Sequence, residues 1–386
     1  MDFRLSADQR ELVETARRYT RAELPAIAEE VEKTGAPPSR ALIRQYAELG
    51  FLGINVPQRL GGLGLGNLEA LLVLEEFAQI SGAVAFPVFE SCVGPVRAIE
   101  RFGHPDLVAA VVPAVCRGET VVAVAMSEPQ AGTALTDLQT RAEVSGAQVI
   151  INGSKRWCSG GGHADGYVVY CRIADAPGAA GIGAVYVEKG TPGLSFGSEE
   201  ALMGFRGVPS SDLYFDNVRV PAHHVVVPAG GFKNLMEAFD LERCGNATMA
   251  LGQASGALQD VIEYVKERKQ FGKPILEFQA VQLKLAEMQM QVEAARLLIH
   301  RAACNAESSL PSPLDSSVAK CFANEIARTV TGNAVQLMGA YGYSKQFAAE
   351  RRLRDAWGWG IAGGAIDIQK VNIAAAMLGR RFDQRR

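Results

Sequence analysis

The sequence has few of the features that metal centres, disulfide scaffolds and nucleic-acid surfaces need. Its five histidines do not have the spacing of zinc ligands, so we expect no metal site. Its seven cysteines are scattered, odd in number and without a Cys-x-x-Cys pair, which is typical of reduced thiols in a cytosolic protein. A net charge of −3 over 386 residues gives no basic excess for binding nucleic acid. These absences favour a metal-free protein of the cytoplasm.

Targeting and membrane segments are also absent from the pattern. No apolar run approaches the roughly 18 residues that a membrane helix needs. The first residues carry Asp8, Glu11 and Glu14, a composition that fits neither a signal peptide nor an acid-poor transit peptide. A chain of this length can bury a large core and is expected to form two or three domains.

The hydrophobic pattern changes twice along the chain. Residues 1–120 predict an N-terminal helical domain, which includes a helix over about 87–102. From residue 121 to 228, short β-branched runs separated by Gly, Pro, Asn and Asp predict a central β domain, with a hairpin turn at 151–154. Residues 229–386 predict a C-terminal helical domain. The fold class is therefore α+β.

Four long helices fit the C-terminal part, and they are expected at 233–267, 279–306, 314–342 and about 361–379. The first gap holds the most informative stretch of the chain, Arg268–Gln279. Gly272 and Pro274 interrupt the helical pattern there, Gly by its flexibility and Pro by its missing N–H. Taken alone, the stretch predicts no more than a turn between two helices.

Four other segments, in a fixed order along the chain, allow a more specific interpretation of this stretch. They are Ala125–Thr133, Asn152–Ser159, Met203–Gly207 and Ala334–Gly339. With Arg268–Gln279 they resemble the acyl-CoA dehydrogenase family, flavoenzymes that desaturate acyl thioesters. The resemblance extends over almost the whole chain. It implies an N-terminal helical domain, a small central β-barrel domain and a C-terminal four-helix bundle, together with FAD as cofactor.

The resemblance also implies which residues contact FAD. Met126, Ser127, Trp157 and Ser159 match positions beside the flavin ring, and Thr133 matches a contact to the flavin or to a pyrophosphate. Outside such a motif, a tryptophan such as Trp157 is more often a core aromatic. The FAD positions expected from the C-terminal part are Arg268, Phe271, Gln279, Gln336, Gly339 and Asp367.

The matches at Arg268, Phe271, Gln279, Gln336 and Gly339 imply contacts to the FAD of a neighbouring subunit, because one chain in this family does not complete its own cofactor site. We therefore expect a homotetramer built as a dimer of dimers. An acyl-CoA or acyl-carrier thioester is the implied substrate, and an electron-transfer flavoprotein is the implied electron acceptor.

The catalytic base is where this sequence departs from most of the family. Many members place a glutamate where this chain has Gly363, which is followed by Gly364 at the substrate end of the site. A minority, such as isovaleryl-CoA dehydrogenase, place it on the first bundle helix just before an arginine, and Glu242 and Arg243 match that pair. A carboxylate suits proton abstraction when an apolar pocket raises its pKa. We therefore predict Glu242 as the base and Arg243 as a substrate-binding residue; a solvated helical glutamate is the alternative.

Two other functions stay open. The chain also resembles 3-sulfinopropionyl-CoA desulfinase, a lyase of the same fold that has Gly-Gly at 363–364 and needs no such base. That enzyme binds its sulfinate with an arginine where this chain has Phe86, and the nearest cation in sequence is Arg97. A flavin-binding protein without catalysis is the second alternative, if Glu242 points away from the site. A dehydrogenase acting on carrier-bound acyl groups is a variant of the first prediction.

Overall fold

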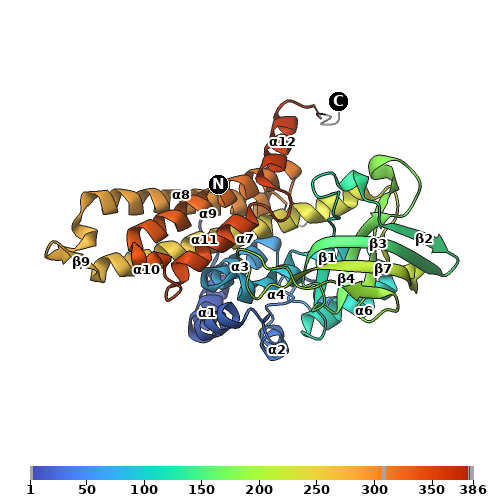
Figure 1. Ribbon diagram of the computed structural model, residues 1–386, viewed down its shortest axis with the longest axis horizontal. Helices are drawn as coiled ribbons and strands as arrows, with labels where there is room; N and C mark the ends of the chain where they lie inside the picture. Colours follow the sequence, from blue (N-terminus) through green and yellow to red (C-terminus); the bar gives the residue numbers. More distant parts are fainter. Residues whose placement is uncertain (1–2, 307–309, 381, 383–386) are drawn as a thin grey trace.

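A computed structural model describes residues 3–306, 310–380 and 382. Most helices lie on one side of the molecule and the β sheet on the other, where the helix at Pro105–Cys116 lies beside the sheet (Figure 1). The N-terminal helices are α1 (Ala7–Thr34), α2 (Arg40–Glu48), α3 (Asn67–Ile80), α4 (Gly82–Cys92), α5 (Pro95–Phe102) and α6 (Pro105–Cys116). The Ser6 side chain accepts a hydrogen bond from the Gln9 N–H and caps α1. The mixture of helix and sheet confirms the predicted fold class.

The single helix predicted over 87–102 is wrong, because the chain breaks into α4 and α5 at Gly94. A residue that precedes proline is disfavoured in the helical region, and Gly94 precedes Pro95. The stretch Gly82–Phe102 is apolar and long enough to cross a membrane by composition, which contradicts the sequence-based expectation. However, 89% of its apolar window is buried inside the protein, so we interpret it as a core element.

The central part forms one eight-stranded sheet. Its strands are β1 (Val122–Ala125), β2 (Arg141–Ser145), β3 (Gln148–Ser159), β4 (Gly166–Arg172), β5 (Ile182–Glu188), β6 (Leu194–Phe196), β7 (Ser210–Pro221) and β8 (Val225–Val227). The order is β6-β7-β3-β2-β4-β5-β8, and β1 pairs with β4 in parallel. Alternate side chains of β3, β4, β5 and β7 fill one apolar core.

The hairpin turn predicted at 151–154 is also wrong, because these residues lie within β3. The turn lies earlier, at Gly146 and Ala147, between β2 and β3. Gly153 has a φ of 140° beside a shift in the register of β3 against β7. A Cβ atom there would lie 2.7 Å from the Thr140 Cα, so glycine is needed for a close approach of two strands.

The C-terminal helices are α7 (Phe232–Glu267), α8 (Gln279–Asn305), α9 (Pro313–Met338), α10 (Ala340–Tyr343), α11 (Ala348–Trp359) and α12 (Ile366–Met377). The first two predicted helices are confirmed. The third ends at Met338, because Gly339 has a φ of 60°, and the fourth begins only at Ile366, because Gly363 and Gly364 both have positive φ. Helix α11 was not predicted.

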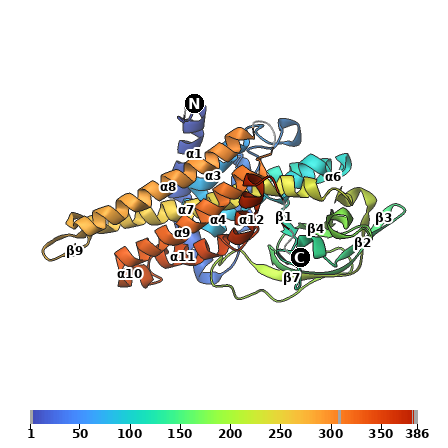
Figure 2. The ribbon, with the colours of Figure 1, turned by 90° about the horizontal axis from the view of Figure 1, so that it is seen from above.

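Between α7 and α8, Lys269–Gln270 (β9) and Lys273–Pro274 (β10) form a small hairpin whose turn residues are Phe271 and Gly272. This hairpin projects at the end of the bundle farthest from the sheet (Figures 1 and 2). Short 3-10 turns lie at Gln58–Leu60, Leu135–Asp137, Gly178–Gly181, Ala222–His224 and Ile275–Glu277.

Helix α7 connects the parts of the fold. Its later turns lie in the large helical core, whereas its first turns reach the sheet (Figure 2). There Leu235 and Ala238 join a second apolar cluster with Val96 and Ala98 of α5 and with Tyr170 of β4. The junction of α5, α7 and β4 is therefore a place where three separate segments meet.

Candidate active site

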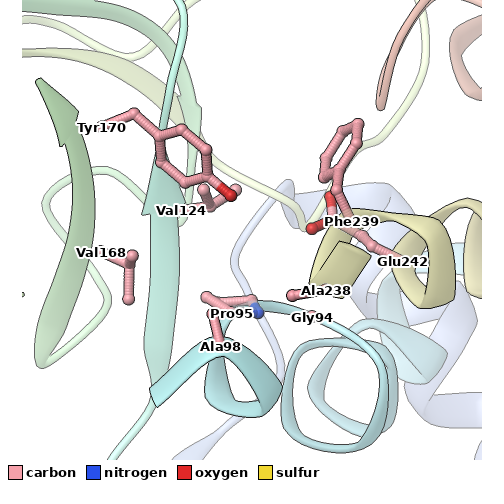
Figure 3. A pocket seen from close by; sticks show the side chains of 9 residues that line it. All are labelled: Gly94, Pro95, Ala98, Val124, Val168, Tyr170, Ala238, Phe239 and Glu242. Carbon is pink, nitrogen blue, oxygen red and sulfur yellow. The ribbon is translucent and has the colours of Figure 1, made fainter. Parts of the chain in front are cut away.

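A small cavity lies at this junction (Figure 3). It encloses about 240 Å³ of free space, including its open mouth. Its lining residues come from the α4–α5 break, α5, β1, β4 and α7, and they are Gly94, Pro95, Ala98, Val124, Val168, Tyr170, Ala238, Phe239 and Glu242. Only Tyr170 and Glu242 among them have polar side chains, so the cavity combines apolar walls with one carboxyl and one hydroxyl group.

Glu242 reaches the cavity because of its place on α7. Residues three and four positions apart share one face of a helix, so Ala238, Phe239 and Glu242 point the same way. In Figure 3 the carboxyl group of Glu242 points from α7 toward the sheet. Burial raises the pKa of Glu242 to about 8, and the opposing charges of Lys320 and Arg243 limit the rise. Such a carboxyl group can accept a proton near neutral pH.

Tyr170 lies opposite the Glu242 carboxyl group in the cavity (Figure 3). Its hydroxyl points from β4 toward α7 across the cavity (Figure 3). The pKa of Tyr170 is raised first by burial and then by the negative charge of Glu242. The two polar groups of the cavity therefore face each other closely enough to interact electrostatically.

Arg243 is not among the described residues that line the cavity. It is buried and forms an ion pair with Asp240, and Asp240 also accepts a hydrogen bond of 2.8 Å from the Ser316 hydroxyl on α9. Its guanidinium group lies 5.1 Å from the centre of the Phe239 ring. Arg243 therefore supports the start of α7. Its role in substrate binding stays a prediction.

Gly363 and Gly364 lie in the loop between α11 and α12, with φ angles of 64° and 84°. A Cβ atom on Gly363 would lie 3.2 Å from the Asn246 Nδ2 and 3.8 Å from the Lys320 Nζ. Asn246 is one helical turn after Glu242 on α7. The position that carries the base in many relatives and the position of Glu242 therefore adjoin the same part of α7.

Lys320 of α9 holds this loop in place. Its buried ammonium group donates hydrogen bonds to the carbonyl oxygens of Trp359 (3.1 Å) and Ala362 (2.8 Å) and to the Asn246 Oδ1 (2.7 Å). Burial, and after it the charge of Arg243, lowers the pKa of Lys320 to about 7. Sequence reasoning missed Lys320, because a single lysine within a helix gives no local sign of what it bonds.

The residues predicted to contact the flavin ring gather at the ends of β1 and β3. The Arg156 N–H donates to the Ser127 carbonyl oxygen at 2.9 Å, which ties the segment after β1 to β3. The completely buried Lys155 ammonium group donates to the Met126 carbonyl oxygen at 3.0 Å and to Glu128 at 2.7 Å. Met126, Ser127, Trp157 and Ser159 are therefore held on one rigid unit, and Thr133 lies exposed in the loop that follows β1.

Trp157 presents an exposed aromatic ring beside this unit. Its side chain is 51% exposed, its backbone has a φ of 61° at a bulge where the pairing of β3 with β7 shifts, and the Arg156 guanidinium lies 4.3 Å from the centre of its ring. The interpretation of Trp157 as a core aromatic is therefore wrong. An exposed aromatic ring on a rigid support is a stacking surface, and partly exposed Ser159 beside it offers a hydroxyl group. The chemistry of this set agrees with an isoalloxazine site.

The other predicted FAD residues lie far from this unit. Arg268, Phe271 and Gln279 are exposed around the β9–β10 hairpin, and the Phe271 side chain is 93% exposed. Gln336 and Gly339 are exposed at the end of α9, and Arg268 lies 5.8 Å from the ring of Tyr341 in α10. Figure 1 shows β9 and α10 at the end of the bundle remote from the sheet. One chain does not bring the two sets together.

The remaining predicted positions do not line the cavity. Asp367 is exposed in the first turn of α12. Phe86 stacks on Phe89 with ring centres 5.6 Å apart and also lies near Trp359. Arg97 donates to the Asn55 carbonyl oxygen at 3.0 Å and lies 3.4 Å from Glu100. Phe86 is uncharged and Arg97 is not among the described residues that line the cavity, so neither position supplies a cation for a sulfinate there.

One carboxyl group near the cavity was missed from the sequence. Glu90 of α4 is 5% exposed, and across the described ranges its Oε2 has no hydrogen-bond partner. Burial raises the pKa of Glu90 well above its usual range, and the charge of Glu242 raises it further. A signal was present, because Glu90 is the one acidic residue between Gly82 and Ile99, an otherwise apolar stretch.

Comparison with protein families gives three matches that cover most of the chain. The N-terminal domain of acyl-CoA dehydrogenase matches residues 6–119, the middle domain residues 123–218, and the C-terminal domain residues 229–378.

Individual proteins match over nearly their whole length. A 3-sulfinopropanoyl-CoA desulfinase of Variovorax paradoxus is 35% identical, with 100% of this chain and 98% of that protein covered. The structure of butyryl-CoA dehydrogenase from Megasphaera elsdenii is 34% identical and has a TM-score of 0.93, with 98% of this chain and 100% of that one covered. A structure described as the FAD complex of PigA is 27% identical with a TM-score of 0.92, covering 98% and 99% of the two chains.

Proposed function

Because this chain belongs to the acyl-CoA dehydrogenase family, we propose that it is an FAD-dependent acyl-thioester dehydrogenase that uses Glu242 as its base. FAD is the cofactor that the family relationship indicates. One observation carries the proposal: the Glu242 carboxyl group lies in an apolar cavity that raises its pKa to about 8. A base with that pKa is strong enough to remove a weakly acidic C–H proton and is partly ionised at neutral pH.

The residues of the chain have separate tasks in the proposed reaction. Glu242 takes the proton from Cα of the acyl group. Bound FAD supplies the acceptor for the hydride that leaves Cβ, and the product is the 2,3-enoyl thioester. Trp157 and Ser159 hold the ring edge on the sheet, and the apolar walls around Val124 and Ala238 exclude water from the carboxyl group.

The second candidate is a non-oxidative lyase of the desulfinase type. The 35% identity to a desulfinase and the glycine at position 363 favour it. The cavity speaks against it, because none of the described residues that line it carries a positive charge for a sulfinate, while Glu242 and nearby Glu90 carry carboxyl groups. We therefore rank desaturation first.

We also propose a homotetramer, a dimer of dimers, in which the hairpin of one chain completes the FAD site of another. The separation of Trp157 from Arg268 within one chain supports this (Figure 1). A stripe of apolar side chains on α8 supports it further: Leu283, Met290 and Leu297 recur every seven residues and are 60%, 71% and 45% exposed. Light scattering that finds a stable monomer with full flavin content would contradict it.

The remaining parts of the proposal concern its setting. Electron-transfer flavoprotein is the proposed acceptor, and the acyl group is presented by CoA or by a carrier protein. A cytoplasmic location is proposed because all seven cysteines are free thiols and only Cys304 is exposed.

Anaerobic bleaching of bound FAD by a panel of acyl thioesters tests the reaction. The dehydrogenase predicts stoichiometric bleaching and an enoyl product with at least one member, whether CoA-linked or carrier-linked. Sulfite release from 3-sulfinopropanoyl-CoA without bleaching by any saturated thioester would support the lyase instead. Tight FAD binding with neither reaction would indicate a flavin-binding protein without catalysis.

A further inference from the structure

Glu90 is a buried carboxyl group that lies next to the cavity. It lies on α4, one turn before the break at Gly94, and Gly94 lines the cavity. A Cβ atom on Gly94 would lie only 3.0 Å from the Glu90 Oε2. Glu90 is not itself among the described residues that line the cavity; it lies directly behind Gly94, which has no side chain to separate the two.

The surroundings of Glu90 also place it beside the reacting groups. The charge of Glu242 on α7 raises the pKa of Glu90, after the larger effect of burial. The charge of Glu90 in turn raises the pKa of the buried Cys158 thiol on β3, between Trp157 and Ser159. Glu90 therefore lies within electrostatic reach of both the proposed base and the strand that carries the predicted flavin contacts.

Nothing in the described part of the chain compensates the Glu90 carboxyl group. It forms no ion pair or hydrogen bond there, and its Oε2 is completely covered. A buried carboxylate without a cation is strongly disfavoured, so the group is held as the neutral acid. A neutral carboxylic acid has one O–H donor. A buried donor without an acceptor is costly, and a ligand oxygen placed in the cavity removes that cost.

We propose that Glu90 determines specificity by donating a hydrogen bond from its neutral carboxyl group to an oxygen atom on the acyl chain of the substrate. The inference rests on the proposed function, because it assigns the cavity to the acyl group. The substrate class is then a short acyl thioester that bears a hydroxyl or carbonyl oxygen beyond its thioester carbonyl.

Matched ligands test this directly. Pantetheine thioesters contain the part that CoA and carrier proteins share, so they suit either presentation. The first pair is 3-hydroxypropanoyl and butanoyl, and the second is 4-hydroxybutanoyl and pentanoyl; each pair exchanges one hydroxyl for one methyl group. Dissociation constants are measured by calorimetry on FAD-loaded protein carrying Glu242→Gln, so that no turnover disturbs the measurement.

We expect the hydroxyl member of at least one pair to bind roughly 10- to 100-fold more tightly than its methyl partner. Adding Glu90→Leu should reverse that preference, because the donor is replaced by an apolar group. Adding Glu90→Gln should keep part of it, because the amide still donates. Glu237→Gln is the matched control, since Glu237 is a half-exposed carboxylate on α7 that pairs with Lys233 and does not line the cavity.

Several results would overturn the inference. Equal binding within both pairs, or a preference that Glu90→Leu leaves intact, would show that Glu90 does not read the acyl chain. Tighter binding of the 3-aminopropanoyl or 4-aminobutanoyl thioester would show an ionised Glu90 that recognises an ammonium group. Loss of FAD bleaching by butanoyl thioester in Glu90→Gln, as large as that in Glu242→Gln, would make Glu90 the base. Because binding is measured apart from bleaching, failure of the dehydrogenase proposal would be seen separately.

Discussion

Glu242 and Gly363 occupy two positions that serve the same chemistry in different relatives, and both adjoin Asn246. Glu242 stands on α7, a helix of 36 residues whose next turns are buried in the core. Gly363 stands in a loop with a φ of 64° that hydrogen bonds from Lys320 hold in place. The helix fixes the direction of its side chain by its own backbone, whereas the loop depends on contacts from a distant helix.

The difference bears on which of the two positions can hold the proposed base. A carboxyl group on α7 needs only a helical residue whose neighbours, here Ala238 and Phe239, already form an apolar wall. A carboxyl group at position 363 needs a non-glycine residue in a left-handed conformation, which costs about 1–3 kcal/mol unless the surroundings impose it. In this chain the loop is hydrogen-bonded to Lys320, but position 363 is a glycine and has no carboxyl group. We therefore assign proton abstraction to Glu242 on the helix.

Removing the carboxylate from the helix should have the largest effect. Glu242→Gln keeps the shape of the side chain and removes the basic oxygen. We expect the rate of FAD bleaching to fall by about 10²–10⁴ while FAD stays bound. Stopped-flow absorbance under anaerobic conditions gives the rate, and Glu237→Gln on the same helix is the control. Bleaching at the wild-type rate would remove Glu242 from the mechanism.

Moving the carboxylate to the loop is the next test. The double variant Glu242→Gly, Gly363→Glu should regain part of the lost rate, because the new Cβ would lie 3.8 Å from the Lys320 ammonium and near Asn246. Recovery should be incomplete, since catalysis needs placement within about half an ångström and the new residue is strained by its positive φ. The single variant Glu242→Gly sets the baseline, and a double variant no faster than it would show that the loop cannot support the base here.

The remote half of the cofactor site offers a smaller test that touches neither base position. Arg268→Ala removes a charged donor at the far end of the bundle. If it serves the FAD of a neighbouring subunit, the loss should be roughly 1.5–3 kcal/mol of FAD binding, or about 10- to 150-fold in the dissociation constant. Fluorescence of FAD released on dilution measures this. Retention equal to that of the wild type would mean that Arg268 does not contact the cofactor.

The smallest expected effect concerns pH. The base must be ionised, so bleaching should rise with pH around a midpoint near 8. The charge of Lys320 lowers the pKa of Glu242, and Lys320, whose own pKa is about 7, is only partly charged near this midpoint, so Lys320→Met should raise the midpoint slightly. Lys320→Arg keeps the charge and should stay closer to the wild type. A midpoint that falls in Lys320→Met would contradict the assignment.

The raised pKa has a matching effect on stability. A carboxyl group whose pKa is higher when folded stabilises the protein fully below its unfolded pKa, and this contribution is lost as pH rises toward 8. The Tm of Glu242→Gln relative to the wild type should therefore be more favourable at pH 9 than at pH 5. Scanning calorimetry of FAD-loaded protein checks this sign.

The sequence predicted the family and the order of helical and β regions, because these depend on local patterns; its assignment of Glu242 as the base stays a prediction. It failed at 87–102, where Pro95 and Gly94 together end a helix that apolar composition alone would continue. It missed β2, because this strand has only five residues and only one of them, Ala142, is buried. Tyr170 and Lys320 were missed because only the packing of distant segments brings them near Glu242. Glu90 was missed although it is the one acidic residue between Gly82 and Ile99.

Proton exchange at Cα tests the central claim, that Glu242 is the base, without involving hydride transfer. An acyl thioester whose Cβ is replaced by sulfur can lose a Cα proton but has no hydride to give. FAD-loaded protein is incubated with it in D₂O, and deuterium at Cα is followed by NMR. Glu242 should catalyse this exchange, with a rate that rises toward pH 8, and Glu242→Gln should slow it by at least about 100-fold. Exchange at the wild-type rate in Glu242→Gln would contradict the account.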